Sequence, residues 1–345
     1  MAESPLTIAM LLATPGKSWG GMEKHTAELV EALAHKGHVV HLVGHPAYQN
    51  RFSTSVHFHP MPMHLGRRNP VLHLKLRKLL RRLAPDLCHG QGNKAICLLS
   101  RLKLPAKQVG TIHGIKKNHQ GLERMDAVIG VSQTVMATLN HPNKTLIYHG
   151  SSTGQLPPSS PSPFSTNSSV QAVSIGRLEP VKGFDVLIKV WKQLNNDERL
   201  TIIGEGSQRN SLEEQISATG LSSRVSLAGF QSAPESWLKH ADVCIVSSHR
   251  EGLSYVVIEA LQAGCPVLAT PVAGAMELLP ATAVAENNSA EAIYQLLATH
   301  LPALKQLSVI ERPAMEHARR ELTIENMVCR TEDIYQKLLR STGHD

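Results

Sequence analysis

Apolar residues in the first half of the chain fall into short runs that alternate with stretches of helical periodicity, such as His25–His35 and Leu72–Leu83. Strands that alternate with amphipathic helices are typical of a parallel sheet whose strands are joined by crossover helices. The pattern therefore predicts a doubly wound α/β domain over residues 1–155. Its strands are expected at Thr7–Leu12, His38–Val43, Val56–Pro60, Asp86–His89, Gln108–His113, Ala127–Val131 and Thr145–Tyr148.

The same alternation begins again after a segment rich in serine and proline, which has no period and predicts a linker over residues 156–169. A second α/β domain is expected over 170–325, and a C-terminal helix over 326–345. Two doubly wound domains bind ligands at the carboxyl ends of their strands, and these edges can face one another across a cleft. Strands are expected at Val170–Ile175, Leu200–Ile203, Val225–Leu227, Val243–Val246 and Val267–Ala269, and helices at Phe184–Leu194, Ser207–Thr219, Ser254–Ala263, Ala290–Leu297 and Ile324–Leu339.

Two segments of the first domain carry candidate ligand-binding residues. Gly20 and Gly21 lie between the first strand and the first helix, where glycine lets the backbone approach a ligand and a helix N-terminus favours a phosphate. His113 ends a strand and is followed by glycine, so it is expected where parallel sheets bind ligands. Taken alone, these features also fit an ordinary turn and a structural histidine.

Two further segments belong to the second domain. Arg177 and Lys182 follow a predicted strand, and a guanidinium with an ammonium suits a diphosphate, although two solvated cations would give the same pattern. Glu251 is predicted in a loop and Glu259 in the helix after it. The apolar residues between them predict a buried Glu259, which needs hydrogen-bond partners. Carboxylates accept hydrogen bonds from the vicinal hydroxyls of a sugar or ribose.

The charge is unevenly divided along the chain. Residues 1–165 carry 19 Lys and Arg against 7 Asp and Glu, whereas residues 166–345 carry 16 against 21. A basic first domain favours an anionic partner. Aromatic residues make up only 4% of the chain, which argues against a nucleic-acid partner bound by base stacking.

Part of this basic charge falls on the segment RRNPVLHLKLRKLLRRL, residues 67–83. As a helix it would place five leucines on one face and the cations on the remainder. A basic amphipathic helix of this type can lie on an anionic membrane, and it can equally be a crossover helix with its leucines in the core. No apolar run is long enough to cross a bilayer, and the five cysteines form no C-x-x-C pair. We therefore expect a cytoplasmic protein with reduced thiols, able to lie peripherally at the inner face of the cytoplasmic membrane.

Four stretches in this order resemble glycosyltransferase family four, whose members have the GT-B fold of two Rossmann-like domains. They are GGMEKHTAELVEALAHKGHVV, SIGRLEPVKGFDVLI, IIGEGSQRNSLEEQISATGLSSRVSLAGF and EGLSYVVIEALQAGCPVLATPVAGAMELL. The chain departs from the family at His149-Gly150, where Asn-Gly is usual. It also departs at Thr270–Glu277, where a glycine pair is half lost. These departures concern local loop shape.

The resemblance implies a set of site residues. Those implied in catalysis are His113, Arg177, Lys182 and Glu251. Those implied in binding the donor are Gly20, Gly21, Arg177, Lys182, Glu251, Gly252, Leu253 and Glu259. Arg177 and Lys182 would hold the diphosphate and Glu259 the ribose hydroxyls. Glu251, with the backbone after it, would orient the donor sugar beside His113.

The reaction implied is transfer of a sugar from a nucleotide diphosphate sugar of the UDP or GDP type, with retention at the anomeric carbon and with no metal or other cofactor. No D-x-D motif is present to hold a metal. The implied acceptor is a glycan or glycolipid in lipopolysaccharide or cell-surface polysaccharide biosynthesis, and the last helix would pack back on the first domain. Two alternatives are a sugar-nucleotide epimerase of the same fold and a non-catalytic protein that binds a nucleotide sugar.

Overall fold

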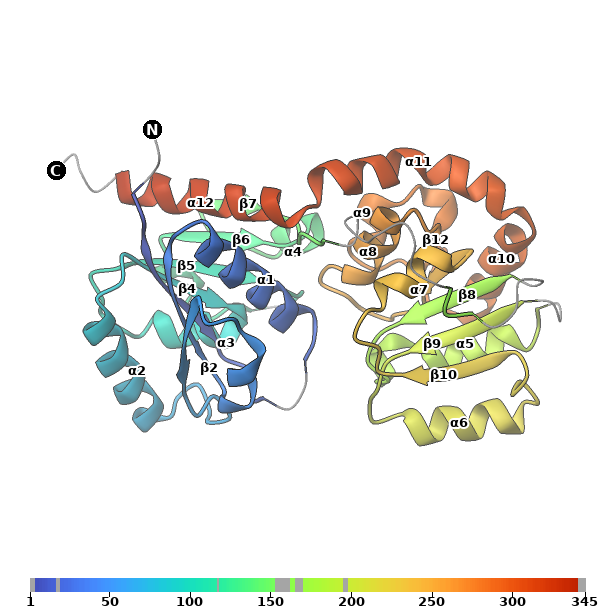
Figure 1. Ribbon diagram of the computed structural model, residues 1–345, viewed down its shortest axis with the longest axis horizontal. Helices are drawn as coiled ribbons and strands as arrows, with labels where there is room; N and C mark the ends of the chain where they lie inside the picture. The colour runs from blue at the N-terminus through green and yellow to red at the C-terminus, as the bar shows by residue number, and fades with distance from the viewer. Residues whose placement is uncertain are drawn as a thin grey trace. The chain divides into compact units, whose positions relative to one another are not determined.

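The protein is described from a computed structural model, which covers residues 4–16, 19–116, 118–152, 162–164, 170–194 and 198–340. The chain divides into two compact units, Met1–Gly150 with Ile324–Asp345 and Ser151–Thr323 (Figure 1). The predicted linker over 156–169 lies outside the described residues except for 162–164.

The described strands of the first unit form a parallel sheet in the order β3-β2-β1-β4-β5-β6-β7. Each was predicted to within two residues at either end. Their bounds are β1 Thr7–Leu12, β2 Val39–Gly44, β3 Val56–Pro60, β4 Leu87–Gln91, β5 Lys107–Ile112, β6 Ala127–Gly130 and β7 Lys144–Leu146. The helices of this unit are α1 Gly21–His35, α2 Pro70–Leu83, α3 Gly92–Leu99, α4 Gln133–Met136 and α12 Ile324–Arg340.

The core of the first unit lies between the sheet and two helices from opposite ends of the chain. Helix α1 buries Leu29 and Leu33 there, and α12 buries Val328 and Tyr335 in the same cluster. A large apolar side chain contributes roughly 1.5–3 kcal/mol when it is fully buried. Helix α12 therefore packs on the first unit (Figure 1).

Two polar contacts also tie α12 to the first unit. Glu332 pairs with Lys36, and its Oε1 lies 2.8 Å from His38 Nε2. The carboxylate thus joins α12 to the segment between α1 and β2.

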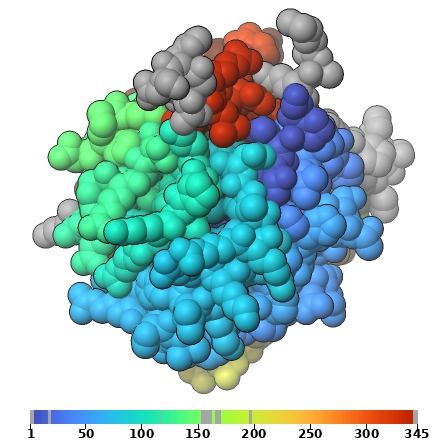
Figure 2. Space-filling model, turned by 90° about the vertical axis from the view of Figure 1, so that its left-hand side faces the viewer, coloured from blue at the N-terminus to red at the C-terminus, as the bar shows by residue number. Residues whose placement is uncertain are grey.

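Helix α2 is a crossover helix whose leucine face is occupied. The Asn69 side chain caps it by accepting from Leu72 N at 3.1 Å, and Pro70 begins the helix. Its four buried leucines are Leu72, Leu76, Leu79 and Leu80. The leucine face therefore packs into the unit and is not open to a membrane, whereas the basic face remains exposed. Figure 2 views the molecule from the side on which α2 lies.

The described strands of the second unit form a parallel sheet in the order β10-β9-β8-β11-β12. Their bounds are β8 Gln171–Ile175, β9 Arg199–Ile203, β10 Val225–Gly229, β11 Val243–Val246 and β12 Val267–Ala269. The helices are α5 Phe184–Trp191, α6 Arg209–Ala218, α7 Glu235–His240, α8 Tyr255–Ala263, α9 Ala275–Leu278, α10 Ala290–His300 and α11 Leu304–Glu321. The sequence did not predict α3, α4, α7, α9 or α11.

In both sheets the strand order reverses beside the first strand, between β1 and β4 and between β8 and β11. With right-handed crossovers, helices before and after such a reversal cover opposite faces, and a crevice opens at the carboxyl ends of the two strands. In the first unit this point lies at Leu12 and Gln91, and in the second at Ile175 and Val246. The loops that follow these four residues are therefore where a ligand is expected in each unit.

All five cysteines are free, and four of them are buried. Cys329 is the exception, because it lies exposed on α12. Among the described residues, none of the helices combines the length and the hydrophobicity that a bilayer-spanning segment needs.

Candidate functional site

The loop after β8 is held by the loop after β9. Gly176 N donates to Ile203 O and Leu178 N donates to Glu205 O, each at 2.9 Å. A Cβ on Gly204 would lie 1.9 Å from Gly176 O, and one on Gly206 would lie 2.4 Å from Leu178 O. These two glycines thus let one loop backbone support the other.

Lys182 and Glu251 meet at the switch point of the second sheet. Lys182 Nζ lies 2.5 Å from Glu251 Oε1, and Ser248 Oγ donates to the same oxygen at 2.7 Å. Their side chains are 17% and 14% exposed, so the pair is largely shielded yet reachable. The Lys182 stem passes close to Gly176, where a Cβ would lie 3.2 Å from its Cε. No pattern in the sequence indicated this ion pair, because the two residues are far apart along the chain.

Arg177, in the same loop after β8, differs from Lys182 in its surroundings. Its side chain is exposed, and no hydrogen bond or ion pair joins it to another residue in the described ranges. A guanidinium without a protein partner keeps its donors for a ligand, and it can bind phosphate oxygens in bidentate fashion.

Glu259 lies inside α8, and only 3% of it is exposed. The sequence predicted both the helix and the burial. The helix follows Ser254, whose side chain makes no capping hydrogen bond. Gly274, at φ 86°, allows the next loop to approach Leu253, because a Cβ there would lie 2.7 Å from Leu253 Cδ1. Of the glycine pair that is usual in the Thr270–Glu277 segment, this chain therefore keeps Gly274, the glycine that the close approach to Leu253 requires.

In the first unit, His113 directly follows β5, as predicted, and belongs to a buried cluster of polar rings. Its Nε2 lies 2.7 Å from Gln91 Oε1. Its ring centroid lies 4.8 Å from that of His25 and 5.5 Å from that of His149. His25 and His149 also contact each other through their Nδ1 atoms, at 2.8 Å.

Burial lowers the pKa of all three histidines. It lowers the pKa of His25 to about 3, and it lowers those of His113 and His149 well below 6.5. Their mutual repulsion as cations adds to the effect of burial on His113 and His149. The cluster is therefore neutral at physiological pH. Gln91 and His25 were not candidates from the sequence, and His149 was noted only as a departure from the family pattern, although the first half holds most of the chain's histidines.

Gly20 and Gly21 form the start of α1, as expected. Gly20 is the N-cap residue, and its N–H donates to Glu23 Oε2 at 3.1 Å. Trp19, just before them, packs edge-on against Tyr48 at 5.4 Å and carries Arg51 over its ring at 4.6 Å. Residues 17 and 18 of this loop lie outside the described residues.

Two family descriptions match this chain in succession. "Glycosyltransferase Family 4" matches residues 19–150 and "Glycosyl transferases group 1" matches residues 161–302, so together they span most of the chain. The chain belongs to the family-four glycosyltransferases. The sequence resemblance is thereby confirmed.

Individual relatives resemble this glycosyltransferase over different lengths. The glycosyltransferase MJ1059 of Methanocaldococcus jannaschii is 39% identical over 101 residues, 28% of this chain and 25% of that protein. The match thus spans about a quarter of that relative. The lipopolysaccharide core biosynthesis mannosyltransferase LpsB of Rhizobium meliloti is 23% identical over 274 residues, 71% of this chain and 76% of that protein.

A solved structure also shares the fold of this glycosyltransferase. HepE of Anabaena, in complex with UDP and glucose, superposes with a TM-score of 0.80 at 17% identity. The superposition covers 96% of this chain and 100% of that chain. The GT-B fold with two Rossmann-like domains is therefore confirmed.

Each unit of the glycosyltransferase gathers part of the predicted site. In the second unit, Lys182 and Glu251 are in direct contact. Arg177 lies in the loop that also carries Lys182, and Glu259 lies in α8, the helix that follows Glu251. In the first unit, His113 lies against Gln91. Within the described ranges, no group of three or more His, Cys, Asp and Glu is placed to hold a metal ion.

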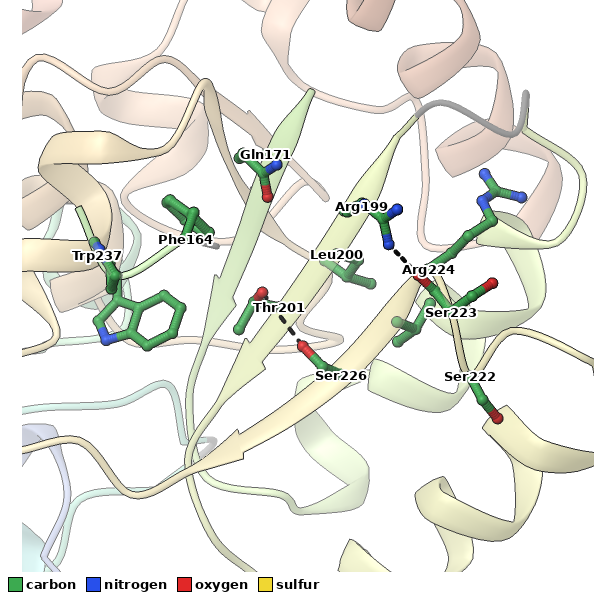
Figure 3. Close-up of a pocket in the computed structure, with 12 residues that line it drawn as sticks. Phe164, Gln171, Arg199, Leu200, Thr201, Ser222, Ser223, Arg224, Ser226 and Trp237 are labelled. Atoms are coloured by element: carbon green, nitrogen blue, oxygen red, sulfur yellow. Dashed lines mark hydrogen bonds between the residues drawn. The ribbon is translucent and has the colours of Figure 1, made fainter. Parts of the chain in front are cut away.

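A cavity of about 270 Å³ lies in the second unit of the glycosyltransferase, away from these residues. It opens at the amino ends of β8, β9 and β10, whereas Lys182 and Glu251 follow carboxyl ends. Figure 3 shows Phe164 and Trp237 together on one side, where their rings pack edge-on at 5.3 Å. Because parallel sheets bind ligands at the opposite edge, this cavity is no part of the predicted site.

Proposed function

We propose that this protein is a retaining glycosyltransferase that moves a sugar from a nucleotide diphosphate sugar to a glycan or glycolipid acceptor. The observation that carries the proposal is the contact of Lys182 with Glu251. Arg177 lies in the loop after β8 that also carries Lys182, and Glu259 lies in α8, which follows Glu251 along the chain. A nucleotide sugar presents a diphosphate to the cations and hydroxyls to the carboxylates.

The proposed division of roles follows from these environments. Arg177 and Lys182 bind the diphosphate oxygens, while Glu259 accepts hydrogen bonds from the ribose hydroxyls. Glu251 faces Lys182, so it is close enough to the phosphates to orient the sugar that they carry. Gly252 and Leu253, which come just before α8, supply backbone contacts to the donor.

In the proposed reaction the bond from the anomeric carbon to the diphosphate oxygen breaks, and a bond from that carbon to the acceptor hydroxyl oxygen forms. The proton of the acceptor hydroxyl passes to an oxygen of the leaving diphosphate. Negative charge grows on the diphosphate during bond breaking, and cations that are already positioned beside it stabilise the transition state. We propose that Arg177 and Lys182 supply this stabilisation without a metal ion.

We further propose a lipid-linked acceptor of the kind used in lipopolysaccharide or cell-surface polysaccharide biosynthesis. The similarity to LpsB over most of both chains supports this class. So does the outer face of α2, where Leu74 is 69% exposed among exposed cations. Each basic residue near an anionic surface adds about 1 kcal/mol, so this face would dock the enzyme weakly and salt-sensitively. On this proposal the enzyme works at the inner face of the cytoplasmic membrane.

The proposed activity is tested by incubating the protein with a panel of UDP-, GDP- and ADP-sugars, with and without sugar acceptors, and by measuring hydrolysis and transfer. Release of a nucleoside diphosphate from one donor, increased by an acceptor, with the product anomer matching the donor, supports the proposal. A change of the donor sugar's own configuration without transfer would indicate an epimerase. Binding without turnover would indicate a non-catalytic protein.

A further inference from the structure

Gln91 ends β4 and His113 follows β5, so the two residues leave neighbouring strands at the same edge of the first sheet. Gln91 is only 1% exposed, and its side chain is held on both sides. Its Nε2 group lies 3.1 Å from Met10 Sδ, and its Oε1 lies 2.7 Å from His113 Nε2. A thioether sulfur can only accept a hydrogen bond, so the amide nitrogen belongs on the Met10 side and the carbonyl oxygen faces His113.

This orientation decides which nitrogen of His113 carries the proton. A carbonyl oxygen only accepts, so His113 Nε2 must donate to it, and a neutral ring then has a bare lone pair at Nδ1. Burial lowers the pKa of His113 well below 6.5, and the neighbouring His25, His149 and His89 further disfavour a positive charge there. The ring is therefore neutral in this setting.

The other side of the ring supports the same tautomer. His113 Nδ1 is shielded from solvent and has no hydrogen-bond partner among the residues that the structure describes. A proton on Nδ1 would be a buried donor without an acceptor, and it would leave the Nε2 lone pair pointing at the lone pairs of Gln91 Oε1. The reverse tautomer is thus disfavoured at both nitrogens.

We propose that Gln91 is a positioning residue that holds His113 as the neutral Nε2–H tautomer, so that any ligand group that reaches the shielded Nδ1 must donate a hydrogen bond to it. This inference rests on the proposed function for its effect on turnover, but not for the tautomer itself. In this state His113 has no proton to give to a leaving group, because its one N–H is held by Gln91. The ligand group that it suits is a donor, such as a sugar hydroxyl.

The test is to measure the protonation of each imidazole nitrogen of His113 by ¹⁵N NMR in the unliganded protein, with His113→Gln used for assignment. The wild type should show Nε2 protonated and Nδ1 unprotonated from pH 6 to 9. An Nδ1-protonated ring in the wild type would overturn the proposal. Because no donor or acceptor is present, this result stands whether or not the protein transfers a sugar.

Gln91→Glu provides the second arm. A carboxylate beside Nε2 raises the pKa of His113, roughly by one to three units for a close opposite charge. If the carboxyl group is itself protonated, it donates to Nε2 and moves the ring proton to Nδ1. Either way Nδ1 gains a proton as the pH falls, at a higher pH than in the wild type, and loses it as the pH rises. We expect kcat/KM of this variant to fall on the acid side of the pH profile, where the wild type is unaffected, and to recover toward the wild-type value at high pH.

The matched control is Gln108→Leu, which removes another buried glutamine from the same sheet that contacts Leu102 O rather than a histidine. It should keep both the wild-type tautomer and the wild-type pH profile. Gln91→Leu should lower kcat/KM by a similar factor at every pH, because leucine does not ionise. It should lack the additional fall at low pH that is expected for Gln91→Glu. A Gln91→Glu variant with unchanged nitrogen signals and an unchanged pH profile would overturn the proposal. If that variant does not fold, the wild-type tautomer decides alone.

Discussion

Lys182 Nζ lies 2.5 Å from Glu251 Oε1, so the cation expected to bind the donor diphosphate is paired with the carboxylate expected to orient the donor sugar. Without ligand, each residue neutralises the other in a largely shielded place. A diphosphate that arrives must share or take over Lys182. Its charge is then matched by Lys182 together with Arg177, whose side chain is exposed. Substitution of either member of the pair therefore also changes the state of the other.

The first prediction concerns the two cations. Arg177→Ala and Lys182→Ala should each lower kcat by roughly 10²-fold, as is typical when one donor that stabilises the transition state is lost. Both residues lie in a loop, so the fold should persist. Steady-state kinetics with the donor found in the panel measure the effect, and Lys192→Ala, an exposed lysine beyond α5, is the matched control. Wild-type turnover in the double variant Arg177→Ala/Lys182→Ala would contradict the assignment.

The second prediction separates the two carboxylates. Glu259→Gln should weaken binding of a bare nucleoside diphosphate, because the ribose hydroxyls lose an ionised acceptor. Glu251→Gln frees Lys182 from its partner, so a bare diphosphate should bind at least as tightly as to the wild type, whereas the sugar-bearing donor should bind less tightly. Isothermal titration calorimetry with both ligands checks this crossed pattern. The two-role assignment fails if the variants respond alike.

The third prediction concerns the basic face of α2. Changing Lys75, Lys78, Arg81 and Arg82 to Gln should abolish co-sedimentation with vesicles containing anionic lipid, while neutral vesicles should bind neither protein. The attraction is electrostatic, so wild-type binding should also fall with added salt.

The control for this experiment neutralises the same number of exposed cations elsewhere, at Lys103, Lys192, Lys305 and Arg312. It should still sediment with anionic vesicles, because net charge is not the cause. No sedimentation of the wild type at low salt would leave α2 as a crossover helix alone.

The fourth prediction concerns Glu311 on α11, which is fully buried. Its Oε2 accepts from Val267 N at 2.9 Å, while Oε1 has no partner among the described residues. Burial raises its pKa from 4.5 to about 8. Between these values the folded protein holds a proton that the unfolded chain has released. The free energy of unfolding should therefore fall as the pH rises from about 5 to about 8.

Urea unfolding at pH 5.5, 7 and 8.5 measures this dependence, at about 1.4 kcal/mol for each unit of pH over which the proton is held. Glu311→Gln carries no ionisable group and should show a flatter dependence. Glu316→Gln, an exposed glutamate on the same helix, should follow the wild type. Parallel curves for the wild type and Glu311→Gln would show that Glu311 does not hold the proton.

The sequence predicted the strands well because each is a short apolar run with polar boundaries. It missed α3, whose first residues are Gly92 and Asn93, and it missed α11, which contains Pro313. Both features are typical of loops and helix ends, and packing overrides them here. The candidate donor-binding residues of the second unit could each be named from the sequence, because they lie in short local motifs.

What the sequence could not supply were contacts between residues far apart along the chain. The pairing of Lys182 with Glu251 depends on the reversal of strand order between β8 and β11, which no local pattern encodes. The same holds for Gln91 and His113, which meet because β4 and β5 are neighbours. The spacing of the leucines in α2 suits a helix packed on a core and a helix lying on a membrane equally well. Only their burial in the structure shows that they face the core.

The most direct test of the account is to titrate UDP, GDP and ADP into the wild type, Lys182→Ala and Lys192→Ala by calorimetry. We expect one of the three nucleotides to bind the wild type and Lys192→Ala with the same affinity. The same nucleotide should bind Lys182→Ala at least about tenfold more weakly, because a close charged contact to phosphate is worth about 1.5–3 kcal/mol. Equal binding by Lys182→Ala, or no binding of any of the three nucleotides by the wild type, would contradict the claim that this site holds the donor diphosphate.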